Sequence, residues 1–248
     1  MGDPRWFVAT RSDVGVIYVK PYLSAGYGMP HWIWAGVDLN ALSTTETLQV
    51  YSGVRASTPI FDLAFGVRDT WSYFRPFLEP SDSYTHSAIV DAPGDNARYW
   101  AYELEAVSVV PLPYSAIIAN FVAIGTLDVP KGSYVYDEAY RLVVADSLFF
   151  ALRLGAVARF LNENSLKVGV LVEHLFGTGR DEPVTRFGPV GALQLTDHLE
   201  INAALTFAVS SPDHLGIFDG TYGVAGFRYR WATGERNPQL PWKGDLIP

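Results

Sequence analysis

Residues 199–209 read Leu-Glu-Ile-Asn-Ala-Ala-Leu-Thr-Phe-Ala-Val. The apolar side chains take alternate positions, namely Leu199, Ile201, Ala203, Leu205, Phe207 and Val209. The positions between them are polar or small: Glu200, Asn202, Ala204, Thr206 and Ala208. Successive side chains of a strand point to opposite faces, so one face can meet hydrocarbon while the other meets a filled or hydrated interior. Because this pattern recurs along the chain, it predicts a closed transmembrane barrel rather than a soluble domain.

The recurring alternation predicts an all-β chain that forms a single antiparallel up-and-down transmembrane β-barrel of about twelve strands. Each expected strand has roughly the length that a tilted membrane strand needs, and most of the breaks are short and rich in turn residues. The expected strands are 14–26, 31–42, 46–56, 60–74, 97–110, 115–128, 133–143, 148–161, 166–177, 185–196, 199–210 and 221–232. The barrel then spans 14–232, with an N-terminal extension over 1–13 and a C-terminal tail over 233–248.

Composition narrows the setting and the partners. The formal net charge of −8 offers no overall attraction to nucleic acid. The absence of cysteine excludes disulfides, thiol catalysis and cysteine-zinc sites. The chain has no apolar run of about 18 residues, so the sequence does not predict a transmembrane helix. The N-terminus lacks the charged start and apolar core of a secretory signal, so an export signal is expected to have been removed if the barrel lies in an outer membrane.

Segment 75–96 is the longest stretch without a clean period, and long loops in compact domains are commonly functional or mobile. The expected strand order places this segment on the same side as both termini. The long loops of outer-membrane barrels, however, lie on the extracellular side. Either the expected order is wrong nearby, or this is an unusual periplasmic loop.

Charged side chains recur on the expected inward face, where arginines outnumber acids. The candidate pore-lining residues are Arg55, Arg68, Glu103, Glu105, Arg153, Arg159, Glu173, Glu200, Arg228 and Arg230. The same expected inward face carries Asp62, Lys167 and Arg186. Rings of one charge select ions in a pore, whereas interleaved opposite charges cross-link and fill a narrow interior. Both interpretations stay open, and the excess of arginine motivates the hypothesis of a preference for anions.

Tryptophans near the ends or outer faces of expected strands predict an interfacial girdle, because anchoring in a bilayer needs rings repeated around the barrel. The candidate membrane-interface residues are Trp32, Trp34, Trp71, Trp100 and Trp231. A platform for stacking sugars is the alternative interpretation of these rings. Their positions in the folded barrel distinguish the two.

The sharpest catalytic candidate is His86 beside Ser87, with Asp91 nearby. A serine nucleophile needs a base within hydrogen-bond reach and a third group that orients this base. Outer-membrane phospholipases and lipid A deacylases carry a His-x-Ser spacing, which puts both side chains on one face of a strand. Here the two residues are adjacent and would diverge in a strand, so a solvated polar loop is the favoured interpretation.

We expect neither a metal site nor a cofactor. The other histidines show no His-x-His or His-Glu-x-x-His spacing. The acidic loops lack the ligand spacing of a calcium loop. The glycines do not follow the order of strand, glycine loop and helix that binds phosphate.

These patterns resemble those of bacterial outer-membrane β-barrel proteins in general. The resemblance covers residues 14–232 and rests on alternation, turns and aromatic residues rather than on a family motif. Such proteins often end their last strand with an aromatic residue, for which Trp231 is the nearest match, although this chain continues to Pro248. The resemblance implies a location in the outer membrane of a Gram-negative bacterium, with its lipids as partners.

The favoured function is a narrow pore or binding channel for small polar or anionic solutes, acting by diffusion and without covalent chemistry. Two other functions stay open. One is a structural barrel that anchors an envelope assembly through protein partners, and the other is a serine-type lipid hydrolase of the outer membrane. A soluble β-sandwich or ligand-binding barrel is the alternative fold.

Overall fold

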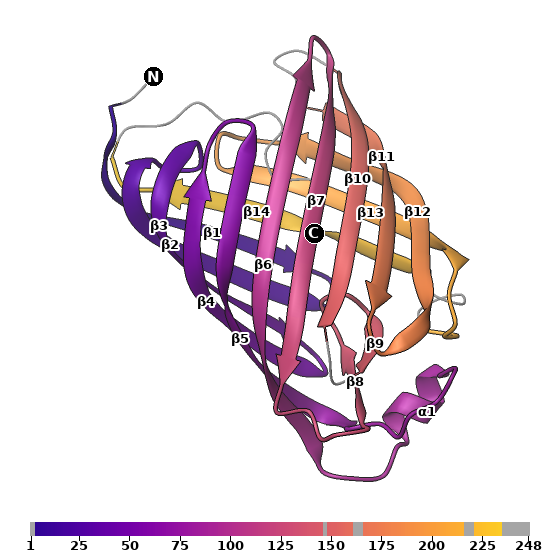
Figure 1. The fold of residues 1–248 in the computed structure, drawn as a ribbon. Coiled ribbons are helices and arrows are strands. Elements are labelled where there is room, and N and C mark those ends of the chain that lie inside the picture. The colour runs from indigo at the N-terminus through magenta and orange to yellow at the C-terminus, as the bar shows by residue number, and fades with distance from the viewer. Residues whose placement is uncertain (1–2, 146–147, 161–165, 216–220, 235–248) are drawn as a thin grey trace.

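Twelve strands hydrogen-bond into one closed antiparallel barrel, in the order β1-β14-β13-β12-β11-β10-β7-β6-β5-β4-β3-β2 (Figure 1). The computed structural model describes residues 3–145, 148–160, 166–215 and 221–234. The barrel strands are β1 (Arg5–Gly15), β2 (Tyr18–Met29), β3 (Ile33–Thr44), β4 (Thr47–Ser57), β5 (Phe61–Pro76), β6 (Asn96–Leu112), β7 (Ser115–Leu127), β10 (Leu148–Phe160), β11 (Leu166–Gly177), β12 (Arg180–Gln194), β13 (Leu199–Ser210) and β14 (Tyr222–Ala232). Because β1 pairs with β14, the sheet has no free edge whose backbone N–H and C=O groups would lack hydrogen bonds in hydrocarbon. The predicted fold class is confirmed.

The two faces of the barrel differ as the alternation predicts. On β13, Leu205 and Phe207 are exposed, whereas Glu200 and Asn202 are buried. The same division recurs on β5, where Phe65 is exposed and Arg68 is buried. Exposed apolar rows of this extent are typical of a surface that faces lipid.

The barrel begins earlier in the chain than the sequence predicts. β1 covers most of the expected N-terminal extension over 1–13, and the expected strand 14–26 is divided by the turn between β1 and β2. β1 belongs to the barrel because its inward charges have partners there: Asp13 lies 2.6 Å from Arg228 and 3.6 Å from Arg11. Of the expected tail over 233–248, residues 235–248 lie outside the described residues.

The expected barrel strand 133–143 is also wrong. This stretch contributes to a separate two-stranded sheet formed by β8 (Tyr134–Asp137) and β9 (Leu142–Ala145), and β7 pairs directly with β10. We call residues 134–145 the lumen hairpin. Its turn includes Arg141, whose φ of 52° lies in the left-handed region and which directly precedes β9.

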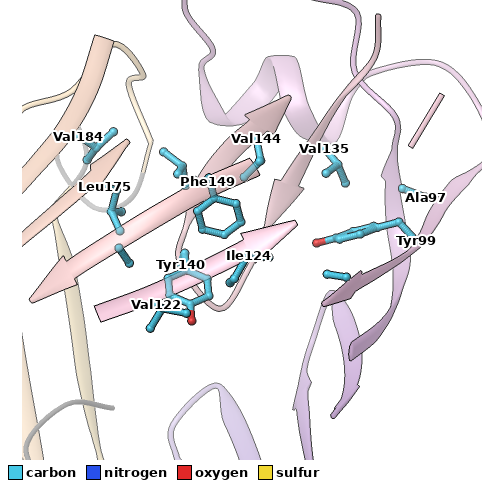
Figure 2. Close-up of a cluster of buried hydrophobic side chains, with 13 residues drawn as sticks. Ala97, Tyr99, Val122, Ile124, Val135, Tyr140, Val144, Phe149, Leu175 and Val184 are labelled. Atoms are coloured by element: carbon cyan, nitrogen blue, oxygen red, sulfur yellow. The ribbon is translucent and has the colours of Figure 1, made fainter. Parts of the chain in front are cut away.

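The lumen hairpin packs inside the barrel wall. Val135 and Val144 belong to a buried cluster with inward side chains of the wall, including Ile124 of β7, Phe149 of β10 and Leu175 of β11 (Figure 2). Ile124 and Leu175 are completely buried. The hairpin therefore lies inside the barrel, at the end opposite the start of β1 and the end of β14.

Segment 75–96 lies at that same end. Adding β1 to the barrel reverses the side to which this segment is assigned, so its expected position beside the termini is wrong. It contains the short helix α1 (His86–Val90), capped by the Thr85 side chain, which accepts a hydrogen bond from the backbone N–H of Ala88. In the described parts of the chain, no helix is both long and apolar enough to cross a membrane.

The segment covers the lumen hairpin. Leu78, Tyr84 and Ile89 pack with Val143 of β9 and with Leu215, and we call this cluster the loop cap. Burial raises the pKa of Tyr84 to about 12, so its hydroxyl stays protonated and donates to the carbonyl of Glu79. Hairpin and loop cap together obstruct one end of the barrel.

Candidate functional site: the charged lumen

The alternation of burial along the strands places all ten candidate pore-lining residues on the inward side of the barrel. We call the space they surround the lumen. Four ionic groups that include candidate residues cross-link strands of the lumen wall, and a further group joins Arg75 of β5 to Glu46 and to Glu138 of the lumen hairpin.

The first group is centred on Arg55 of β4. Its guanidinium lies 2.8 Å from Asp38, 2.5 Å from Asp62 and 3.3 Å from Glu105. The Nδ2 of Asn120 donates to Glu105 at 3.0 Å. One cation thus faces three carboxylates, so this part of the lumen keeps an excess of negative charge.

The second group ties the lumen hairpin to the barrel wall. Arg68 of β5 lies 3.2 Å from Glu103 and 3.5 Å from Asp137 of the hairpin, and it donates to the side chain of Gln49. The hydroxyl of Tyr99 also donates to Asp137, at 3.0 Å. Asp137 is buried, so its two wall partners compensate for removing its charge from water.

The third group ties the other side of the hairpin. Glu173 of β11 lies 2.7 Å from both Arg153 and Arg186. Arg186 also donates to the backbone carbonyls of Tyr140 and Arg141 in the hairpin turn, at 3.1 and 2.8 Å. Here two cations share one carboxylate, which is the reverse of the Arg55 group.

The fourth group has members on β11, β13, β14 and β1, which lie in this order around the barrel with β12 between β11 and β13. Glu200 is fully buried and lies 3.1 Å from Lys167, 3.6 Å from Arg228 and 3.7 Å from Arg230. Arg228 also reaches Asp13. Outside these groups, Arg159 donates to the backbone carbonyl of Pro113 in the turn between β6 and β7.

Several lumen residues are not among the sequence-based candidates. They are Arg11, Asp13, Lys20, Asp38 and Asp137. Asp13 and Asp38 are buried on inward positions of β1 and β3. The alternation of residues 5–15, with Trp6, Val8 and Val14 outward, is the signal that could have identified the first two of these residues.

Apolar side chains are buried inside the barrel at the end where β1 begins and β14 ends. Phe7, Ala9 and Trp34 form one buried cluster. Val107, Val109, Ala116, Ile118, Val157 and Ala192 form another. The ionic groups therefore lie between an apolar zone at one end and the lumen hairpin at the other.

The predicted tryptophan girdle is wrong at Trp34. Trp34 is an even number of residues from the inward Asp38, so its side chain points to the same, inward face of β3. The ring is buried there and packs edge-on against Phe7. Trp100 and Trp231 are exposed on outward positions. Trp71 lies on the same face as Trp100, with the guanidinium of Arg98 over its ring.

The fifth candidate, Trp32, lies in the turn between β2 and β3, where it is half-buried. The sequence reasoning also missed Trp6, which is exposed on β1 and packs edge-on against Tyr27 of β2. Exposed rings on outward positions suit the boundary between hydrocarbon and headgroups.

Quenching by lipid separates these tryptophans. In vesicles of brominated phospholipid, we expect Trp231→Phe to lower the quenched fraction of the fluorescence, because a ring in contact with acyl chains is lost. Trp34→Phe should raise that fraction, because a protected ring is lost. Equal changes in the two variants would contradict the assigned faces.

The catalytic candidates are not assembled into a triad. His86 and Ser87 are both exposed in α1, and the Ser87 hydroxyl lies 3.1 Å from that of Thr85. Asp91 is exposed and ends the helix, with its backbone N–H bonded to the carbonyl of Ser87. The described residues contain no group of three His, Cys, Asp or Glu side chains that could hold a metal ion.

No family model matches the chain, and no curated protein matches it. Among solved structures, a chain from "Unveiling the Mechanism Behind the in-meso Crystallization of Membrane Proteins" matches with a TM-score of 0.51 at 7% identity, over 93% of this chain and 85% of that one. The β domain of the Bordetella autotransporter Brka matches with a TM-score of 0.49 at 14% identity, over 93% and 100%. A KdgM porin matches with a TM-score of 0.44 at 7% identity, over 90% and 98%.

At these identities the likeness concerns the fold. A closed antiparallel barrel with an apolar exterior and a charged interior is a transmembrane β-barrel. The chain has the fold of the bacterial outer-membrane β-barrel proteins, as the sequence resemblance predicts.

Proposed function

We propose that the protein is a narrow channel of the bacterial outer membrane for small polar solutes. The observation that carries this proposal is the incomplete burial of inward charges: Glu105 and Arg11 keep 28% and 26% of their side chains exposed. Charges in a fully packed interior would be desolvated at a high cost. The partial exposure supports a hydrated path past them.

Simple anions are preferred over simple cations in this proposal. The described inward positions of the strands carry more cations than acids, although the whole chain has a net charge of −8. A lumen with low-dielectric walls concentrates the ion of opposite sign. The lumen hairpin and loop cap restrict the path to small solutes.

Reversal potentials in planar bilayers test the channel and its selectivity. In a KCl gradient, we expect conductance steps with a reversal potential on the anion-selective side. Arg11→Gln should move the potential toward zero, because it removes a cation from the lumen. Arg98→Gln is the matched control, since it removes the same charge from an outward side chain that is 57% exposed.

Two outcomes contradict this proposal in different ways. A cation-selective potential would end the anion preference. The absence of any conductance step from protein that migrates as a folded barrel would end the proposed channel.

A structural barrel is the second candidate function. The buried pairing of Glu200 with Lys167, and of Glu173 with Arg153 and Arg186, favours it, because interleaved charges of this kind cross-link a filled interior. A barrel of this type would anchor envelope partners through the exposed part of segment 75–96. Silence in bilayers, together with retention of an envelope protein that is lost when residues 79–83 are replaced by Gly-Ser, is the result expected of this function.

A further inference from the structure

The charges of the lumen are divided between two walls. The basic wall consists of β10–β14, β1 and β2, and the acidic wall consists of β3–β6. The basic wall carries the inward cations Arg11, Lys20, Arg153, Arg159, Lys167, Arg186, Arg228 and Arg230 against the acids Asp13, Glu173 and Glu200. The acidic wall carries Asp38, Asp62, Glu103 and Glu105 against Arg55 and Arg68. A further cation, Arg75 at the end of β5, is paired with Glu46 and with Glu138 of the lumen hairpin.

The strand order places the two walls opposite each other. β14 and β6 are six places apart in either direction around the closed barrel. β13 faces β5 and β12 faces β4 by the same count. Between the acidic wall and β10 lies β7, whose inward polar side chains include Asn120 but no charged residue.

Pairing within each wall does not cancel its excess. On the acidic wall, the single guanidinium of Arg55 is shared by Asp38, Asp62 and Glu105. On the basic wall the ratio is reversed, because Arg153 and Arg186 share Glu173. Glu200 is likewise shared by Lys167, Arg228 and Arg230. The two walls therefore keep net charges of opposite sign.

The exposed charges of the lumen show the same division. Glu105 on the acidic wall and Arg11 on the basic wall are the side chains whose partial exposure supports a hydrated path. A solute between them meets carboxylates on one side and guanidinium groups on the other. Opposed charges across a confined space of low dielectric orient a dipole perpendicular to the path.

We propose that the preferred solute is a small zwitterion that carries a carboxylate and an ammonium group, as a free amino acid does. Its carboxylate faces the basic wall, where guanidinium groups bind carboxylates by charge-assisted hydrogen bonds. Its ammonium faces the carboxylates of the acidic wall. This inference rests on the proposed channel and adds the class of solute to it.

Four nearly isosteric solutes test the inference by flux into proteoliposomes: alanine, lactate, lactamide and alaninamide. They are respectively a zwitterion, an anion, a neutral molecule and a cation on the same three-carbon skeleton. We expect alanine to enter at least about threefold faster than lactamide. Two partly exposed charge contacts can supply this ratio. Alanine should also enter faster than lactate.

A matched pair of double variants identifies the cause. Arg11→Gln with Glu105→Gln leaves the net charge unchanged and weakens both walls, so the ratio of alanine to lactamide flux should fall toward one. Arg98→Gln with Asp181→Asn removes one charge of each sign from exposed outward positions and should keep the ratio. Migration as a compact barrel in unheated gel samples confirms that each variant has folded.

The outcomes separate the zwitterion inference from the proposed channel. If alanine enters no faster than lactamide while lactate enters fastest, net charge alone governs passage and the zwitterion inference is overturned. An unchanged alanine preference in the Arg11 and Glu105 variant also overturns it. Failure of all four solutes to enter would instead overturn the proposed channel.

Discussion

Replacing residues 131–144 by a short Gly-Ser linker is expected to raise the conductance of single channels severalfold. These residues include most of the lumen hairpin, which lies inside the barrel at the end opposite the start of β1 and the end of β14. Asp137 binds Arg68 and Tyr99 on one wall, and Arg186 binds the carbonyls of Tyr140 and Arg141 on the other. Removing an obstruction from a narrow pore widens the path for hydrated ions.

A point variant separates loss of the obstruction from damage to the barrel. Asp137→Asn keeps the hairpin but removes the charge that Arg68 faces, so openings should become more frequent without a larger maximal conductance. Asp181→Asn, on an exposed position at the start of β12, should leave gating unchanged. An unaltered conductance in a folded variant with the linker would mean that the hairpin does not lie in the path.

Glu200→Ala is expected to lower the free energy of unfolding by about 3–5 kcal/mol, the usual cost of removing one partner from a buried ionic group. Glu200 is completely buried, and its carboxylate is the common partner of Lys167, Arg228 and Arg230. Without this carboxylate, the positive charges of the three side chains are only partly balanced by acidic partners inside the barrel.

Urea titrations of the reconstituted protein measure this loss. Glu182→Ala removes the same side chain from an exposed position of β12, and its effect should stay within about 0.5 kcal/mol. If Glu200→Ala costs no more than this control, the buried ionic group does not stabilise the barrel.

The bounds of β13 were predictable from sequence, since the expected strand 199–210 is the observed Leu199–Ser210. Its two faces meet different surroundings throughout, so the alternation is uninterrupted. The number of barrel strands is also confirmed, but through two opposing differences. The expectation omits β1 and counts residues 133–143 as part of the barrel.

These differences have a physical cause. Residues 5–15 carry charges that look solvated in isolation, and Arg228, the partner of Asp13, lies near the other end of the chain. The lumen hairpin has an alternating pattern because it packs against the inner wall, not because it faces lipid. Sequence periodicity reports that a strand has two faces and does not report what each face contacts.

The same limit explains β7 and Trp34. The expected strand 115–128 is apolar on both faces because Ile124 faces the hairpin cluster while Ile117 is exposed outward. Trp34 points inward because even-numbered residues of β3 face the lumen. The clustering of aromatic residues in the sequence does not reveal which face each ring takes. The inward charges were predictable from alternation, whereas the two walls depend on the strand order of the closed barrel.

Cysteine accessibility along β13 tests the central claim, an outward face in lipid and an inward face on a hydrated lumen. The chain contains no cysteine, so each single variant carries one thiol. In liposomes, a charged methanethiosulfonate that cannot cross lipid should label Ala204→Cys and Thr206→Cys rapidly, because these inward positions are partly accessible. The outward variants Ala203→Cys and Leu205→Cys should stay protected by acyl chains. Protection of the two inward thiols, or labelling of all four at one rate, would contradict this account.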